Sequence, residues 1–389
     1  MTGLVARIEA ATPPGRDRAV DALRALAILG VVGGHWLVTA LVADSGTVRG
    51  ASPLTAMPHL TPVSWLFQTL AVFFLVGGMV AAGSWASARK RGVPYGRWVG
   101  GRLARLFRPV AAVLVVWTLA AAAMLTSGVG ESTVRALGKL VWSPLWFLLV
   151  FAALTALTPL VARLHPLWPL VVVLHVDLVR LGLGGPRELG WVNVVAGWLV
   201  PYCLGALVAR GGLRGRTNRW ALLLGGAVAA IALVLWAGYP ASMVGVPGGR
   251  ISNLDPPSLA AVAFGLAQCG AALLLLGPLR RVLRRPAVWA VVAVVNLAAM
   301  TVFLWHQTAM IVVTTTALLL ADGPLPGLHT VPDGAGWVVA RLLWLPVFAL
   351  ALLGCWAVFR SYEQGGRRGG GSLVVRESAP ERKGWARRA

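Results

Sequence analysis

The residues of this chain that could do chemistry begin with Arg24 and His35, which share the first long apolar run, residues 21–43. On a helix, the eleven steps of about 100° between them end within about 20° of the starting direction and rise roughly 16 Å. Arg24 therefore lies near one membrane surface and His35 beyond the middle of the hydrocarbon, on the same face. An ionisable side chain at that depth is costly unless it has a partner or a watery cavity, so we predict a functional site there.

The composition indicates the class of protein to which such a helix belongs. Hydrophobic residues make up 58% of the chain and charged residues 12%, and the mean hydropathy is +0.76. These values predict an integral membrane protein. The net charge of +22 lies in short clusters between apolar runs and not along one basic face, so we expect membrane lipids and no nucleic acid as partners.

The apolar windows predict an all-α, polytopic membrane helix bundle with about ten transmembrane helices. The predicted spans are 21–43, 62–86, 109–126, 144–162, 167–181, 191–209, 220–239, 258–279, 298–321 and 337–359. Placing both termini in the cytoplasm puts most Lys and Arg on that side, as the positive-inside rule requires. We thus expect a cytoplasmic N-terminal segment (1–20), a transmembrane domain (21–359) and a disordered basic cytoplasmic tail (360–389).

Composition also bears on metals and on the compartment. The cysteines, Cys203, Cys269 and Cys355, fall in different predicted spans without paired spacing, so we expect neither a disulfide framework nor a metal site. No cleavage site follows the first apolar run, which we expect to be retained as a helix. The high content of Arg, Ala, Gly and Val suggests a GC-rich bacterial genome, and hence a multi-pass protein of the cell (inner or plasma) membrane.

The fifth predicted span carries Asp177 and Arg180, three residues apart. At that spacing the two side chains can pair on one helix face at the outer interface. The alternative is a polar wall that faces outward and receives an acceptor molecule. The sequence leaves both interpretations open.

Four stretches share a pattern with a known family. They are RAVDALRALAILGVVGGH at 18–35, FFLVGGMV at 73–80, GRLARLFRP at 101–109, and the pair LWFLL at 145–149 with MTVFLWHQTAM at 300–310. Together they resemble acyltransferase family 3, whose members move acyl groups, commonly acetyl from acetyl-CoA, to hydroxyls of cell-surface sugars, lipids or secreted small molecules. Gly77 stands where that family usually has Ser.

This resemblance implies a role for both histidines. Acyl transfer to a hydroxyl needs a base that titrates near neutral pH, and His35 is the candidate general base. His306 is the second catalytic candidate, because it could orient the thioester, stabilise the developing oxyanion or shuttle a proton. Either ring could instead form a hydrogen bond between helices with no catalytic role.

The arginines are the candidates for binding the donor. Arg102 and Arg105 share a face at the cytoplasmic end of the third span, and an arginine fork suits the phosphates of coenzyme A, although lipid phosphates would attract it too. Arg24 either helps to hold the donor or pairs with Asp21 one turn earlier. Asp21 and Trp146 are the candidates for binding the acceptor, and an aromatic belt is the ordinary explanation for Trp146.

The predicted function is therefore that of a membrane acyltransferase. We expect it to take an acyl group, acetyl above all, from acyl-CoA to a hydroxyl of a glycan, a lipid or a secreted metabolite of the cell envelope, without a metal. The alternative is a proton-coupled transporter of a small or amphipathic molecule, in which His35, Asp177 and Arg180 would form the site.

Overall fold

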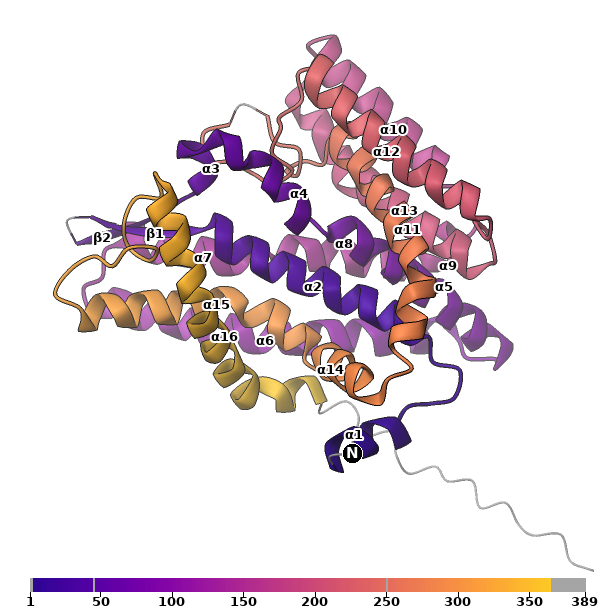
Figure 1. The fold of residues 1–389 in the computed structure, drawn as a ribbon, viewed down its shortest axis with the longest axis horizontal. Coiled ribbons are helices and arrows are strands. Elements are labelled where there is room, and N and C mark those ends of the chain that lie inside the picture. The colour runs from indigo at the N-terminus through magenta and orange to yellow at the C-terminus, as the bar shows by residue number, and fades with distance from the viewer. Residues whose placement is uncertain (1–2, 45, 250, 365–389) are drawn as a thin grey trace, which may run out of the picture.

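The computed structural model describes residues 3–44, 46–249 and 251–364 and shows a bundle of long apolar helices (Figure 1). In that part of the chain, nine helical segments are long and apolar enough to cross a membrane. The long helices are α2 (Arg18–Val38), α5 (Leu70–Lys90), α6 (Tyr95–Thr126), α11 (Gly190–Ala209), α12 (Arg216–Trp236), α13 (Leu259–Val282), α15 (Ala299–Leu320) and α16 (Ala335–Gln364). Shorter helices are α1 (Gly3–Ala10), α3 (Pro53–Ala56), α4 (Ser64–Phe67), α7 (Glu131–Trp142), α8 (Leu145–Ala156), α9 (Thr158–Val161), α10 (Leu167–Asp177) and α14 (Pro286–Leu297). The protein is an all-α, multi-pass membrane protein, as the sequence predicts.

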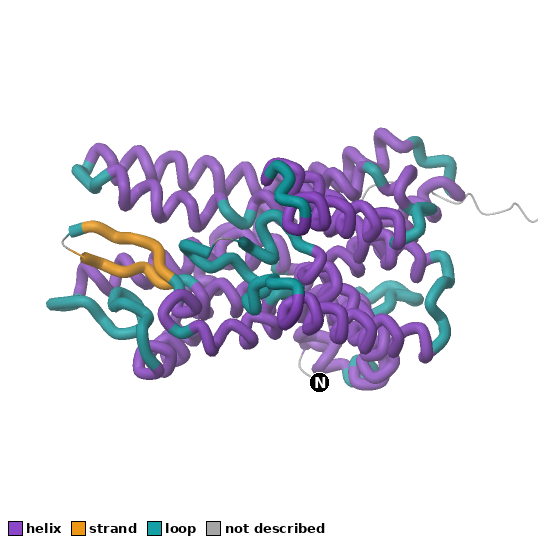
Figure 2. Tube along the Cα trace, turned by 90° about the horizontal axis from the view of Figure 1, so that it is seen from above, coloured by secondary structure: helices purple, strands orange, loops and turns teal. Residues whose placement is uncertain are grey.

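The helix that carries His35, α2, crosses the middle of the bundle (Figure 1). The prediction that it continues to Ala43 is wrong, because it ends at Val38. The next residues form strand β1 (Ala40–Asp44), which pairs antiparallel with β2 (Thr47–Ala51) at one end of the molecule (Figure 2). The physical reason is a distant arginine: Arg341 of α16 donates to the carbonyl oxygens of Trp36 and Thr39, which satisfies acceptors left open at a helix end.

The predicted span 167–181 is helical throughout, but it is not among the segments long enough to cross a membrane. It consists of α10 followed by one π-helical turn, η2 (Leu178–Gly182). The start of the predicted tail also differs, since residues 360–364 continue α16. The rest of the predicted tail, 365–389, lies outside the described residues.

Helices α5 and α11 approach closely because glycines face each other's backbone. A Cβ on Gly78 would lie 2.0 Å from the carbonyl oxygen of Tyr202, and one on Gly205 would lie 2.0 Å from that of Leu75. Neither position has room for a side chain. Gly77, in the same motif, faces Phe151, whose ring would lie 2.4 Å from an added Cβ. The glycines of FFLVGGMV thus serve close packing around the aromatic residues before them.

The end of the bundle at which α2 begins is held by ion pairs, and we call it the arginine-rich end. Arg280 of α13 donates to both oxygens of Asp17, at 3.3 and 2.5 Å, and Asp17 also accepts from the Ala19 N–H at 3.1 Å as the N-cap of α2. Burial alone would raise the pKa of Asp17, but these hydrogen bonds outweigh it and lower the pKa. Arg18 donates to the carbonyl oxygen of Leu283 at 3.2 Å, so α2 and α13 are joined at this end.

Candidate active site

Two histidines from distant parts of the sequence meet in the bundle. His35 lies in the last turn of α2, and His306 lies in α15. Their ring centroids are 5.1 Å apart. His35 is half-buried, whereas His306 is 0% exposed. The pair therefore joins a half-buried ring to a fully buried one.

The hydrogen bonds of His306 determine which ring nitrogen carries its hydrogen. Its Nδ1 lies 2.6 Å from the carbonyl oxygen of Phe303, which can only accept, so Nδ1 carries the hydrogen. In the neutral ring, Nε2 is then an acceptor. Among the described residues, no hydrogen-bond partner reaches this buried Nε2. Such an acceptor leaves room for a hydrogen bond from a ligand or water, as do other unpartnered buried atoms of the described chain, such as Asn193 Oδ1.

The partner of His35 is Gln307, which the sequence analysis missed. The side-chain amide nitrogen of Gln307 lies 3.0 Å from His35 Nδ1, and its buried oxygen Oε1 has no partner in the described chain. The two ends of an amide are assigned from the network and are nearly the same size. Turning the amide round places Oε1 against Nδ1, so that Nδ1 holds the proton and Nε2 of His35 is free to act as a base.

Large aromatic side chains fix α15 in place around the histidines. Trp36 of α2 donates to the carbonyl oxygen of His306 at 2.9 Å, and Trp117 of α6 donates to the hydroxyl of Thr308 at 2.9 Å. Phe303 packs against Phe147 of α8 at 5.5 Å between centroids. Helices α2, α6 and α8 therefore each contribute a contact that positions α15.

Trp146 is half-buried and lies one residue from that aromatic contact. It lines a cavity of about 720 Å³ between α6, α7 and α8, together with Trp117 and Trp142. Arg135 and Lys139 lie along the same cavity. Trp117 lines the cavity and donates a hydrogen bond to Thr308 of α15, so it connects the cavity wall to the helix that carries His306.

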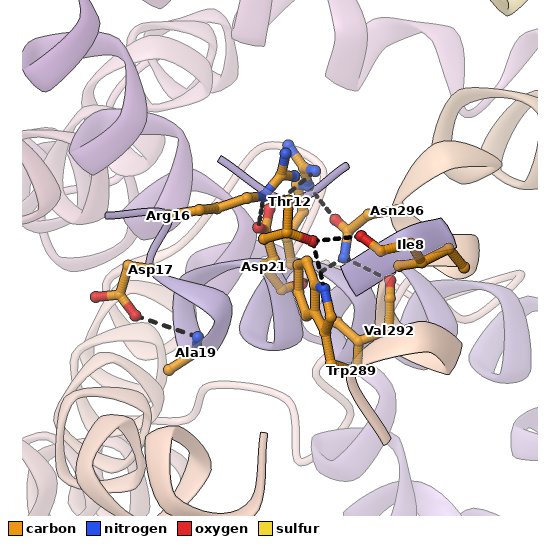
Figure 3. A network of polar contacts seen from close by, with 10 residues as sticks. Ile8, Thr12, Arg16, Asp17, Ala19, Asp21, Trp289, Val292 and Asn296 are labelled. Carbon is orange, nitrogen blue, oxygen red and sulfur yellow. Dashed lines mark hydrogen bonds and ion pairs between the residues drawn. The ribbon is translucent and has the colours of Figure 1, made fainter. Parts of the chain in front are cut away.

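Arg24 and Asp21 form the predicted pair, at 3.3 Å between Nη2 and Oδ1. The other Asp21 oxygen accepts from Arg16 Nε at 2.5 Å, and Arg24 Nε donates to Asn296 of α14 at 2.5 Å. Asn296 also donates to the Asp21 carbonyl oxygen at 2.7 Å. Figure 3 shows Asp21 and Asn296 in this network beside Trp289. Asp21 is thus surrounded by protein groups, and Arg24 is held in a defined orientation.

Arg102 and Arg105 share α6 but have different surroundings. Arg102 is half-buried, donates from Nη2 to the Val80 carbonyl oxygen at 3.4 Å and stacks 5.2 Å from the ring centre of Trp98. Its buried Nε has no partner among the described residues. Arg105 is exposed and donates to the Gly101 carbonyl oxygen at 3.0 Å. Neither arginine is hydrogen-bonded to the histidine pair, so the predicted residues form three groups: the histidine pair, the Arg24–Asp21 pair and the two arginines of α6.

These groups lie within the range that matches a known family. A family model described as an acyltransferase domain, that of acyltransferase family 3, matches residues 17–360. The chain belongs to acyltransferase family 3. No curated protein and no solved structure matched the chain. The protein is therefore a multi-pass membrane acyltransferase, and the matched range contains both histidines together with Arg24, Arg102 and Arg105.

In this acyltransferase, the sequence analysis missed Arg341, a buried cation. Arg341 is 1% exposed and donates to three carbonyl oxygens, of Trp36, Thr39 and Gly327. The signal was present, because Arg341 is a charged residue inside a predicted span, as Arg24 is. Its bonds hold the last turn of α2, in which His35 lies.

Asp177 is also fully engaged with other protein groups. Its carboxylate lies 3.7 Å from Arg180, which confirms the predicted pair, and accepts from Asn193 at 2.9 Å, Tyr239 at 3.0 Å and the Leu259 N–H at 2.7 Å. Burial and the negative charge of Asp177 raise the pKa of Tyr239. Because Asp177 is 2% exposed, the interpretation as an outward-facing polar wall is wrong.

Proposed function

We propose that this acyltransferase moves an acyl group, acetyl above all, from acyl-CoA to a hydroxyl of a glycan, a lipid or a secreted metabolite. The observation that carries the proposal is the histidine pair: a half-buried His35 backed by a buried His306 whose Nε2 has no partner in the described chain. A neutral imidazole that a ligand can reach suits a general base.

In the proposed reaction, the acceptor oxygen attacks the thioester carbonyl carbon while its proton moves to His35 Nε2. The tetrahedral intermediate then collapses, the C–S bond breaks, and the CoA thiolate recovers a proton from the imidazolium. This sequence needs the Gln307 oxygen against His35 Nδ1, and the unpartnered state of that oxygen supports the orientation. Gln307 is then a positioning residue.

The hydrogen bonds of His306 favour one of its predicted roles. With Nδ1–H donated to Phe303, a neutral His306 can accept but cannot donate at Nε2. An oxyanion requires a donor, so the neutral ring does not suit that task. The ring can take up a proton at Nε2 and return it from the same atom, which suits a proton shuttle beside His35, whose ring centroid is 5.1 Å away.

The phosphates of acyl-CoA are proposed to bind the arginines Arg24, Arg102 and Arg105 and not the histidine pair. Arg102 supports this best, because its half-buried guanidinium keeps an Nε–H without a partner among the described residues. Hydrogen bonds from arginine to phosphate are charge-assisted and stronger than neutral ones. Arg105, exposed on the same helix, and Arg24, oriented by Asn296, would complete the set. Asp21 would act by holding Arg24.

The acceptor is proposed to bind in the cavity lined by Trp146. Three indole rings, of Trp117, Trp142 and Trp146, offer flat apolar surfaces, which suit a sugar ring or an amphipathic acceptor. The hydrogen bond from Trp117 to Thr308 joins this cavity to the helix of His306.

The test uses the purified protein in nanodiscs with radiolabelled acetyl-CoA and a glycan and lipid extract. Replacing His35 by Ala should lower transfer by about 10²- to 10⁴-fold, the usual contribution of general base catalysis. His175→Ala is the matched control, because His175 is exposed and hydrogen-bonded to the Val171 carbonyl oxygen of its own helix. Equal turnover in wild type and His35→Ala would remove the base assignment. Uptake into proteoliposomes that depends on His35, without any transfer, would favour the transporter instead.

A further inference from the structure

A second cavity, of about 520 Å³, lies between the start of α12 and the end of α13. Its rim carries Arg216, Arg219 and Arg281, and its wall includes Trp220, Leu223 and Leu274. It lies at the arginine-rich end, because Arg280 of the same α13 turn binds Asp17. No step of the proposed reaction uses it.

The sequence of α13 explains why the hollow exists. At Gly270 the two helices touch, since an added Cβ would lie 2.4 Å from the Leu223 nitrogen. Two turns further on, an added Cβ on Gly277 would meet nothing within 4 Å, and Pro278 follows inside the helix. A missing side chain and a proline therefore leave space between two helices that are otherwise tightly packed.

The charges at the rim lack counter-ions. Arg219 is held by two carbonyl oxygens, of Leu213 at 3.0 Å and Leu273 at 3.1 Å. Arg216 and Arg281 are exposed, and within residues 3–44, 46–249 and 251–364 no carboxylate forms an ion pair with any of these arginines. The first turn of α12 also lacks a side-chain cap, so its N–H groups add positive potential.

The wall below the rim is apolar and continues along an outward-facing helix. Among the residues of α12, only Gly226 and Ala230 are fully buried, and one face of the helix is exposed to the surroundings of the bundle. Trp220 is 42% exposed, and an indole with an apolar body and a polar N–H favours the membrane interface. A cationic rim above an apolar groove matches an anionic head with a hydrocarbon chain.

We infer that this cavity binds an anionic phospholipid, with its phosphate at Arg216 and Arg281 and one acyl chain along Leu223 and Leu274. Arg219, fixed by its carbonyl partners, offers its remaining N–H groups to the same phosphate. The lipid joins α12 to α13, and α13 is in turn joined to the start of α2 through Arg280 and Asp17. The bound lipid therefore stabilises the arginine-rich end of the bundle.

The test measures lipid retention by native mass spectrometry of delipidated protein titrated with phosphatidylglycerol or phosphatidylcholine. In wild type, we expect phosphatidylglycerol to bind and to raise the melting temperature, and phosphatidylcholine to do neither. The double variant Arg216→Gln/Arg281→Gln should bind phosphatidylglycerol roughly 30-fold more weakly. The matched control is Arg284→Gln/Arg285→Gln, which removes the same charge just beyond α13 from exposed residues that do not line the cavity.

A second variant keeps the arginines and fills the groove. Gly277→Leu places a side chain in open space, so the fold should be retained while the acyl chain is excluded. Weaker phosphatidylglycerol binding in this variant and in the double arginine variant, with the control unchanged, supports the site. Equal loss in the control, or equal binding of phosphatidylcholine, overturns it. Displacement of the lipid by coenzyme A, with loss of coenzyme A binding in Arg216→Gln/Arg281→Gln, also overturns it in favour of a donor phosphate site.

Discussion

The bundle holds two buried polar groups of opposite character, the Asp177 cluster and the His35–His306 pair. Around Asp177, the two carboxylate oxygens are bonded to Asn193, Tyr239 and the Leu259 N–H, with Arg180 beside them. Around the histidines, His306 Nε2 and Gln307 Oε1 are buried and without partners in the described chain. The fully bonded carboxylate of Asp177 holds helices together, although the Asn193 Oδ1 of that cluster has no partner in the described chain; the two unpartnered acceptors beside the imidazoles leave room for a substrate.

The largest effect should come from breaking the Asp177 cluster. Asp177→Ala leaves Arg180 buried without its partner, which typically costs about 3–5 kcal/mol, so we expect a large fall in melting temperature. The measurement is thermal unfolding in detergent, with exposed Glu188→Gln as control. A variant that melts like wild type but transfers no acyl group would place Asp177 in the active site and reverse the comparison.

The His35–His306 pair should respond in the opposite way, with a loss of activity and little loss of stability. Gln307→Leu removes the group that orients His35, and misplacement of a catalytic group can cost on the order of 10²-fold in rate. We expect kcat to fall, while KM for acyl-CoA and the melting temperature stay close to wild type. Gln307→Asn, which keeps the amide but shortens its reach, should lie in between. A fall in stability without a change in kcat would make Gln307 a structural residue.

A smaller effect is expected for Arg102, which is proposed to bind acyl-CoA. Arg102→Gln removes the guanidinium that keeps an open Nε–H, so the KM for acyl-CoA should rise roughly tenfold or more, with kcat largely kept. Steady-state kinetics over a range of acetyl-CoA concentrations measures this. Arg108→Gln on the same helix is the control, because Arg108 is exposed. Identical donor titrations for both variants would withdraw the phosphate role.

The last prediction concerns one hydrogen bond of the Asp177 cluster. Tyr239→Phe removes a hydrogen bond to Asp177 and should cost about 1–3 kcal/mol. Burial and Asp177 raise the pKa of Tyr239, so the folded protein holds this proton more tightly than the unfolded chain does. The resulting stability is present below the ordinary tyrosine pKa near 10 and declines as the pH rises above it. Unfolding measured from pH 8 to 11 should show a smaller decline in Tyr239→Phe than in wild type.

Local pairs were accessible to sequence analysis because helix geometry fixes them. Arg24 with Asp21 and Asp177 with Arg180 are each three residues apart, and both pairs are present. The candidate site was accessible only in part. The sequence marked His35 and His306 but gave no reason to place Gln307 against His35, since that contact joins residues 272 positions apart.

By itself, the sequence determined that this chain is a multi-pass helical membrane acyltransferase, because hydropathy is a sum over neighbouring residues and the family motifs are local patterns. Only the tertiary structure decided where α2 ends, since Arg341 binds its last carbonyl oxygens from 305 residues away. It also decided which polar atoms are saturated and which are open. Those properties depend on how separate helices pack, and neither periodicity nor composition encodes which side chains then meet.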